Sequence, residues 1–170
     1  MKWMDMDGIQ RTATIANVLY QEGDALDNKR WTDWLEFYES DCEYWVPAWR
    51  NEEELTEDPT SEVSLIYYAS KAGLEDRVWR VKSGLSAASK QLPRTQHQAN
   101  NVVVSQQEDG VRVRYNWCVN QFDCETRFSH MFYGHAEAEL IFRDDMWRYR
   151  RKKIIVLNDY IPSVIDYYSL

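Results

Sequence analysis

The stretch from Val111 to Asn120 alternates apolar and polar side chains more strictly than any other part of the chain. Its apolar positions are Val111, Val113, Tyr115, Trp117 and Val119. A period of two is typical of a β-strand with one buried face and one solvated face. The preceding Asp109-Gly110 pair indicates a hairpin turn. The sequence therefore predicts an antiparallel sheet that is covered on one side.

Further strands are predicted on both sides of this stretch. One begins around Thr95, and two follow over Arg127 to Phe142 and Trp147 to Leu157, with Asp144-Asp145 as the turn between them. The pattern of the first of these two places Phe142 on the same face as Ala136, Ala138 and Leu140. Long antiparallel strands therefore fill the second half of the chain.

Helical periodicity dominates the first half. It covers Ile9 to Leu26, where only Glu22 interrupts the apolar face, and Arg30 to Glu39. Asp41 to Trp49 and Val63 to Ser70 read as strands. A third helix follows them, with an apolar face of Leu74, Val78 and Val81.

Helices followed by a run of strands predict an α+β fold, with a curved sheet wrapped over the helices as a cone. A length of 170 residues predicts a single domain over 1–170. We expect residues 1–8 to form a peripheral arm. The apolar tail of residues 161–170 is expected to dock on the domain.

Charge and cysteine content exclude several classes of function. A formal net charge of −8 disfavours nucleic acids and anionic membranes as partners. The three cysteines, Cys42, Cys118 and Cys124, do not form a disulfide framework and indicate a reduced, cytoplasmic protein. No apolar stretch is long enough to span a membrane.

Metal sites find little support in the sequence. His130, His135 and Asp123 have the residue types of an iron site, but an offset of five on a strand directs the two histidines to opposite faces. Isolated cysteines do not match iron–sulfur ligation. These spacings therefore predict no metal site in this chain.

An acid–base pocket inside the cone is the alternative, with Asp76, His97 and Tyr115 as possible members. It would make the chain a stand-alone isomerase, dehydratase or cyclase. A small-molecule binding module of the same fold is a second alternative. Asp76 lies beside Arg77 and Arg80, however, which favours structural ion pairing.

A basic run crowds the last predicted strand: Arg148, Arg150, Arg151, Lys152 and Lys153. Charges at adjacent positions place polar side chains on both faces of the strand, which indicates the edge of a contact with a partner. We expect subunit-interface residues or structural ion pairs among Asp76, Arg77, Arg80, Arg148, Arg150, Arg151, Lys152, Asp159 and Tyr160.

Six segments, in order, resemble the small (beta) subunit of Rieske non-haem iron aromatic-ring-hydroxylating dioxygenases. They are DCEYWVPAW, LTEDP, SLIYY, GLEDRVWR, PRTQHQANNV and RRKKIIVLNDYI, and the resemblance covers about Ala16 to Tyr168. The first three favour the benzoate, toluate and anthranilate branch. The arm MKWMDMDG matches no part of the family. Cys118, Cys124 and the segment from Asn120 to His135 match less well than the six segments.

The resemblance implies a cone-shaped fold of the nuclear-transport-factor-2-like or cystatin-like type. It implies a structural subunit without a cofactor, assembled with a catalytic alpha subunit and other beta subunits into an alpha3beta3 hexamer. The Rieske [2Fe-2S] cluster and the mononuclear Fe(II) then belong to the alpha subunit, and a separate reductase supplies electrons from NADH. The whole enzyme is expected to dihydroxylate a benzoate- or anthranilate-like aromatic acid in aromatic catabolism.

Overall fold

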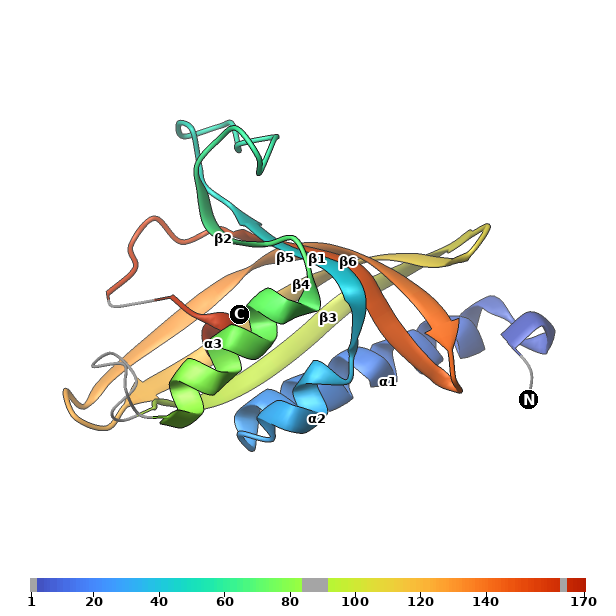
Figure 1. The fold of residues 1–170 in the computed structure, drawn as a ribbon, viewed down its shortest axis with the longest axis horizontal. Coiled ribbons are helices and arrows are strands. Elements are labelled where there is room, and N and C mark those ends of the chain that lie inside the picture. The colour runs from blue at the N-terminus through green and yellow to red at the C-terminus, as the bar shows by residue number, and fades with distance from the viewer. Residues whose placement is uncertain (1–2, 84–91, 163–164) are drawn as a thin grey trace.

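The protein, seen here as a computed structural model that describes residues 3–83, 92–162 and 165–170, is built on one curved six-stranded sheet (Figure 1). The strand order is β2-β1-β6-β5-β4-β3. Their bounds are Tyr38–Pro47 (β1), Ser64–Tyr68 (β2), Arg94–Gln107 (β3), Gly110–Asp123 (β4), Phe128–Arg143 (β5) and Met146–Val156 (β6). Neighbouring strands run antiparallel except β1 and β6, which are parallel. The predicted α+β class with a curved sheet is confirmed.

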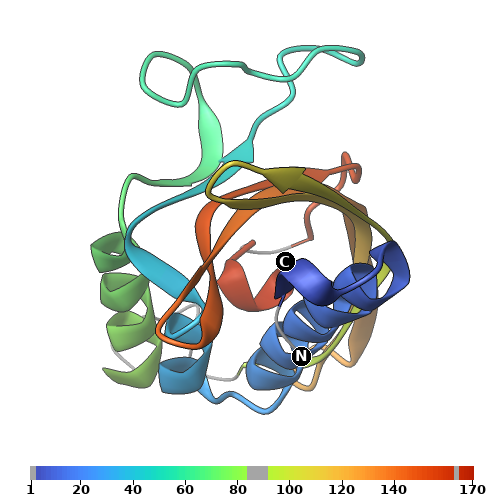
Figure 2. The ribbon, with the colours of Figure 1, turned by 90° about the vertical axis from the view of Figure 1, so that its right-hand side faces the viewer.

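In the described ranges, three α-helices accompany the sheet: α1 (Gly8–Asp27), α2 (Trp31–Leu35) and α3 (Lys71–Ser83). Single 3-10 turns lie at Trp3–Asp5 and Tyr167–Ser169. Figure 2 shows α1 and α2 within the curve of the sheet and α3 beside them. The segment of residues 48–63 projects away from this body between β1 and β2.

Helix α1 follows the predicted pattern closely. A capping box starts it: Asp7 accepts from the backbone N–H of Gln10, and the Gln10 side chain accepts from that of Asp7. Its buried face carries the expected apolar residues together with Glu22. The helix therefore brings one carboxylate into the interior.

The second predicted helix is much shorter than expected. The pattern predicted helix over Arg30 to Glu39, but α2 ends at Leu35 and β1 begins at Tyr38. The backbone N–H of Tyr149 on β6 donates to the Phe37 carbonyl at 2.7 Å. Pairing with β6 thus overrides the local helical periodicity, which was the wrong guide here.

Two of the sheet's hairpins depend on unusual backbone angles. Asp144 and Asp145 have φ of 50° and 60°, as the β5–β6 turn requires. Gly110 has φ of 139°, and a Cβ there would lie 2.2 Å from the Leu140 carbonyl oxygen. Only glycine therefore fits at the start of β4.

The alternation that predicted β4 is confirmed, since all five of its apolar side chains are buried. Phe142 continues this alternation on β5 but is 55% exposed, whereas Leu140 is buried. Phe142 pairs with Trp147 next to the hairpin turn, where the sheet ends. The alternation of β5 continues to the end of the strand, but the layer that covers the sheet does not extend as far as Phe142.

Aromatic rings fill the interior of the cone. Trp34 stacks on Tyr167 with ring centroids 4.7 Å apart, and it meets Tyr38 edge to face. Tyr38 also packs beside Tyr149. The aromatic surplus of the sequence therefore lies largely inside the described part of the fold, and Tyr167 anchors the end of the chain there.

Candidate functional site

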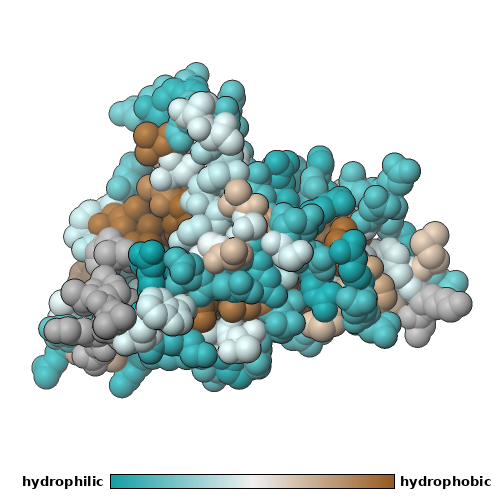
Figure 3. All heavy atoms as spheres, in the orientation of Figure 1, coloured by the Kyte–Doolittle hydropathy of each residue, from teal (hydrophilic) through white to brown (hydrophobic). Residues whose placement is uncertain are grey.

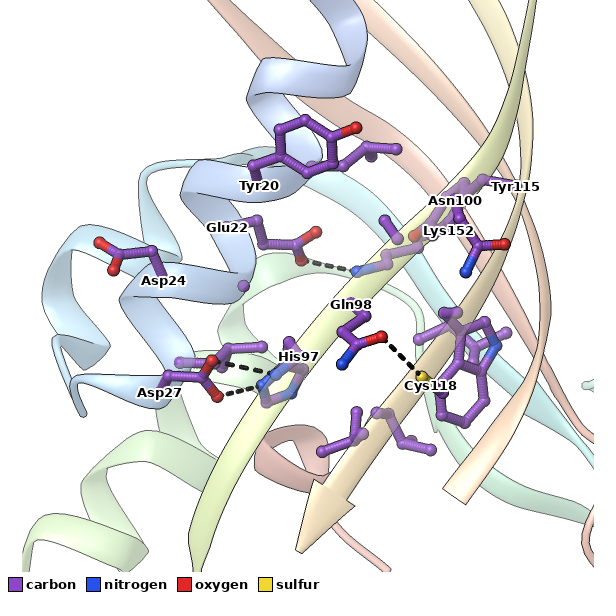
Figure 4. Close-up of a pocket in the computed structure, with 18 residues that line it drawn as sticks. Tyr20, Glu22, Asp24, Asp27, His97, Gln98, Asn100, Tyr115, Cys118 and Lys152 are labelled. Carbon is purple, nitrogen blue, oxygen red and sulfur yellow. Dashed lines mark hydrogen bonds and ion pairs between the residues drawn. The ribbon is translucent and has the colours of Figure 1, made fainter. Parts of the chain in front are cut away.

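A cavity of about 530 Å³ lies between α1 and the strands β3 and β4 (Figure 4). Leu19 and Leu26 from α1 face Tyr115 and Trp117 from β4 across it. Gly23 lies where α1 approaches β3 closely, because a Cβ there would come 3.0 Å from the His97 Cβ. The cavity thus combines aromatic and aliphatic walls with two groups of titratable side chains.

The first group surrounds the buried carboxylate of Glu22. Lys152 Nζ lies 2.6 Å from Glu22 Oε1, and each side chain is only 5% exposed. The hydroxyls of Tyr38 and Tyr149 donate to the two carboxylate oxygens at 2.5 and 2.7 Å. Trp34 Nε1 donates to Oε1 at 3.3 Å. Glu22 is therefore held by one charge and three neutral donors.

These contacts decide the ionisation of the group. Burial raises the pKa of Glu22, but the Lys152 charge and the hydrogen bonds from Lys152, Tyr38 and Tyr149 outweigh it and lower the pKa below its ordinary value. Burial, reinforced by the Glu22 charge, raises the pKa of Tyr38 and Tyr149 well above the ordinary value. The cluster is thus a charged pair ringed by neutral phenols, which suits bracing rather than proton transfer near neutral pH.

A bulge in β6 places Lys152 in this group. The pairing with β5 runs from Leu140↔Tyr149 directly to Glu139↔Arg151, so Arg150 is an extra residue. Tyr149 and Lys152 therefore both point inward, although they are three positions apart. Arg150 and Arg151 lie between these two residues in the sequence, and both are exposed.

The second group joins His97 on β3 to Asp27 at the end of α1. His97 Nδ1 lies 2.5 Å from Asp27 Oδ1, and the His97 backbone N–H donates to Oδ2 at 2.9 Å. The Thr95 hydroxyl also donates to Oδ1. Burial raises the pKa of Asp27, but the hydrogen bonds from His97 outweigh it, and the pKa is lowered. The structure thus ties the helix to the edge strand.

The sequence candidates for an acid–base pocket separate in the structure. His97 and Tyr115 line the cavity, but Asp76 lies on the exposed face of α3, with 67% of its side chain accessible. Asp76 pairs with Arg80 at 3.3 Å. The carboxylate beside His97 is Asp27 instead. The helical pattern in the sequence covers Ile9 to Leu26 and gives Asp27 no partner, so its pairing with His97 was not predicted.

The histidines considered for iron are also apart. His130 points toward the covered side of β5 and His135 toward the exposed side, as the strand spacing predicted. Among the described residues, no group of three or more His, Cys, Asp or Glu side chains could hold a metal ion.

The charged residues of α3 have two different roles. Arg77 donates to both oxygens of Asp166 at distances of 2.6–3.0 Å, and the Asp166 side chain is only 3% exposed. This bidentate pair connects α3 to the end of the chain. The Asp76–Arg80 pair, in contrast, lies in solvent, where such pairs contribute little.

The remaining interface candidates lie on β6 and after it. Arg151 is 56% exposed and contacts Glu43 at 2.7 Å, and Arg150 is 44% exposed and lies 4.0 Å from Glu139. Arg148 is largely covered and donates to the Glu36 carbonyl. Asp159 and Tyr160 follow β6, and Tyr160 is 66% exposed.

The surface is mainly hydrophilic in the view of Figure 3, and apolar side chains gather near β2, beneath the projecting segment. Val63 and Leu65 are exposed there. No helix in the described ranges is both long and apolar enough to cross a membrane.

Comparison with known proteins gives a consistent set of relatives. A family model described as "Ring hydroxylating beta subunit" matches residues 21–163. Toluate 1,2-dioxygenase subunit beta of Pseudomonas putida is 41% identical over 92% of this chain and 96% of its own. Benzoate 1,2-dioxygenase subunit beta of Acinetobacter baylyi is 38% identical over 92% of each chain. The crystal structure of the beta subunit of the benzoate 1,2-dioxygenase from Burkholderia mallei superposes with a TM-score of 0.78 at 32% identity, over 100% of both chains.

Proposed function

Because the chain belongs to the ring-hydroxylating beta subunit family, we propose that it is the structural small subunit of a dioxygenase for a benzoate- or anthranilate-like aromatic acid. The observation that carries the proposal is identity of 41% and 38% to toluate and benzoate dioxygenase beta subunits over nearly the whole chain. An anthranilate 1,2-dioxygenase small subunit is 37% identical. Similar identities to the toluate, benzoate and anthranilate subunits support the aromatic-acid branch as a whole rather than one acid.

In this proposal the catalytic centre belongs to a partner alpha subunit. That subunit would hold a Rieske [2Fe-2S] cluster and a mononuclear Fe(II), and a separate reductase would deliver electrons from NADH. Three alpha and three beta subunits would form a cytoplasmic hexamer. The saturated contacts around Glu22 support a structural role for this chain, because each carboxylate oxygen already has a close donor.

The exposed arginines of β6 are the proposed contact with the partner. Arg150 and Arg151 project from the outer face of the sheet, and their acidic neighbours Glu139 and Glu43 lie on the adjacent strands. Loss of these surface pairs costs the fold only about 0–1 kcal/mol. Reversing the charge of Arg150 and Arg151 therefore tests subunit assembly without unfolding the chain.

The experiment compares two variants in co-expression with a benzoate-type alpha subunit. The double variant Arg150→Glu/Arg151→Glu should lose co-purification and elute as the free small subunit on size exclusion. Arg30→Glu is the matched control, because Arg30 is 46% exposed and paired with Asp24 and Asp33 but lies between α1 and α2. An intact hexamer from the double variant refutes this interface, and failure of the wild-type chain to assemble refutes the proposed function.

A further inference from the structure

We propose that the cavity between α1 and the strands β3 and β4 binds a small, neutral aromatic compound that carries a hydroxyl group. Its volume of about 530 Å³ lies within the usual range for small-molecule sites. The site is formed by this chain alone, so it does not depend on a catalytic partner. It would give the small subunit a ligand of its own.

The walls favour a ring. Tyr115 and Trp117 supply aromatic surface from β4, and Leu19, Leu26 and Ile154 supply aliphatic surface around them. Aromatic side chains pack well against other rings, in stacked or edge-to-face arrangements. A planar apolar body therefore matches this lining better than a sugar or a peptide.

The charges favour a neutral ligand. Glu22 is neutralised by Lys152, and Asp27 is engaged by His97 (Figure 4). Asp24, also in the wall, pairs with Arg30. No lining residue in the described ranges is thus a cation without an acidic partner. A carboxylate ligand would have to lose its hydration without gaining a counter-charge, which is costly.

His97 favours a hydroxyl group. Its side chain is 9% exposed, and its Nδ1 faces Asp27. In the described part of the chain, no group hydrogen-bonds to its buried Nε2. The Nδ1 proton is directed to Asp27. Nε2 therefore accepts a hydrogen bond when the ring is neutral and donates one when the ring is charged. A hydroxyl group can donate to the neutral ring or accept from the charged one.

Because Nε2 is buried, a ligand contacts it only after neighbouring side chains move. Binding should therefore change the environment of the His97 ring more than that of any other histidine. The chain has three histidines, which makes their ring signals easy to separate by NMR.

The test titrates the ¹⁵N-labelled full chain with phenol, toluene and benzoate. Phenol should bind saturably at one site, about tenfold more tightly than toluene, which corresponds to one hydrogen bond of about 1.4 kcal/mol. The Nε2 signal of His97 should shift, and benzoate should bind at least tenfold more weakly than phenol. Equal affinity for phenol and toluene, preference for benzoate, or no saturable phenol binding overturns the proposal.

Two variants add a matched control. His97→Phe keeps the ring but removes Nε2, so phenol affinity should fall to that of toluene. His130→Phe should leave the phenol preference unchanged, because His130 also has a buried Nε2 without a described partner but lies outside this cavity. Equal losses in both variants overturn the assignment to His97. The ligand series on the wild-type chain decides the question even when a variant does not fold.

Discussion

The buried pair of Glu22 and Lys152 gives the sharpest prediction about stability. Lys152→Met removes the charge and leaves Glu22 inside with only neutral donors. Breaking a buried pair in this way costs about 3–5 kcal/mol. Three hydrogen bonds from Tyr38, Tyr149 and Trp34 remain on the carboxylate, so we expect a loss near the lower end, about 3 kcal/mol at pH 7.

The loss should depend on pH with a definite sign. In the wild-type protein the pKa of Glu22 is lowered below its ordinary 4.5, so its stabilisation is present above that value and is lost as the pH falls through the folded pKa. In Lys152→Met, burial acts without the opposing charge and raises the pKa. The folded variant then gains stability as the pH falls. The difference between the two proteins should therefore shrink from pH 8 to pH 5.

Urea unfolding at both pH values measures this difference. Arg80→Met is the matched control, because it removes an arginine from the exposed pair with Asp76 and should cost less than about 1 kcal/mol at either pH. The double variant Glu22→Gln/Lys152→Met should recover part of the loss and show no such pH dependence. Equal losses for Lys152→Met and Arg80→Met, or a pH-independent loss, would refute the argument.

Two further predictions concern the end of the chain and the first hairpin. Arg77→Met should cost about 3 kcal/mol in urea unfolding and should speed hydrogen exchange in residues 165–170, because it leaves the buried Asp166 carboxylate without its cation; unchanged exchange there would contradict this role. Gly110→Ala should lower the thermal unfolding temperature by several degrees, because φ of 139° and the Leu140 carbonyl exclude a Cβ. Gly8→Ala, with nothing within 4 Å of the added Cβ, is its control and should change little.

Local patterns predicted much of the fold because they report burial directly. The alternation from Val111 to Val119 and the face of Leu74, Val78 and Val81 were correct in the structure. Partners distant in sequence were not predictable in the same way. Asp27 and His97 are 70 residues apart, and Arg77 and Asp166 are 89 apart. Each residue alone reads as an ordinary surface charge.

A weak signal for the Glu22–Lys152 pair was nevertheless present. Glu22 was the only polar residue on the buried face of its helix, and Lys152 lies two and four residues before the buried Ile154 and Val156. Reading that alternation backwards from Val156 assigns Lys152 to the interior. Reading it forwards from Tyr149 assigns it to the surface, and only the bulge at Arg150 resolves the conflict.

The bulge also changes the argument about the basic strand. Charges at consecutive positions suggested a strand that is polar on both faces. Lys152 on the inner face is buried, however, and β6 lies between β1 and β5 in the middle of the sheet. One extra residue lets Tyr149 and Lys152 point inward while Arg150 and Arg151 point outward. A charged run can therefore belong to a central strand when one cation finds a buried carboxylate. The exposed arginines are then available for a partner without any cost to the core.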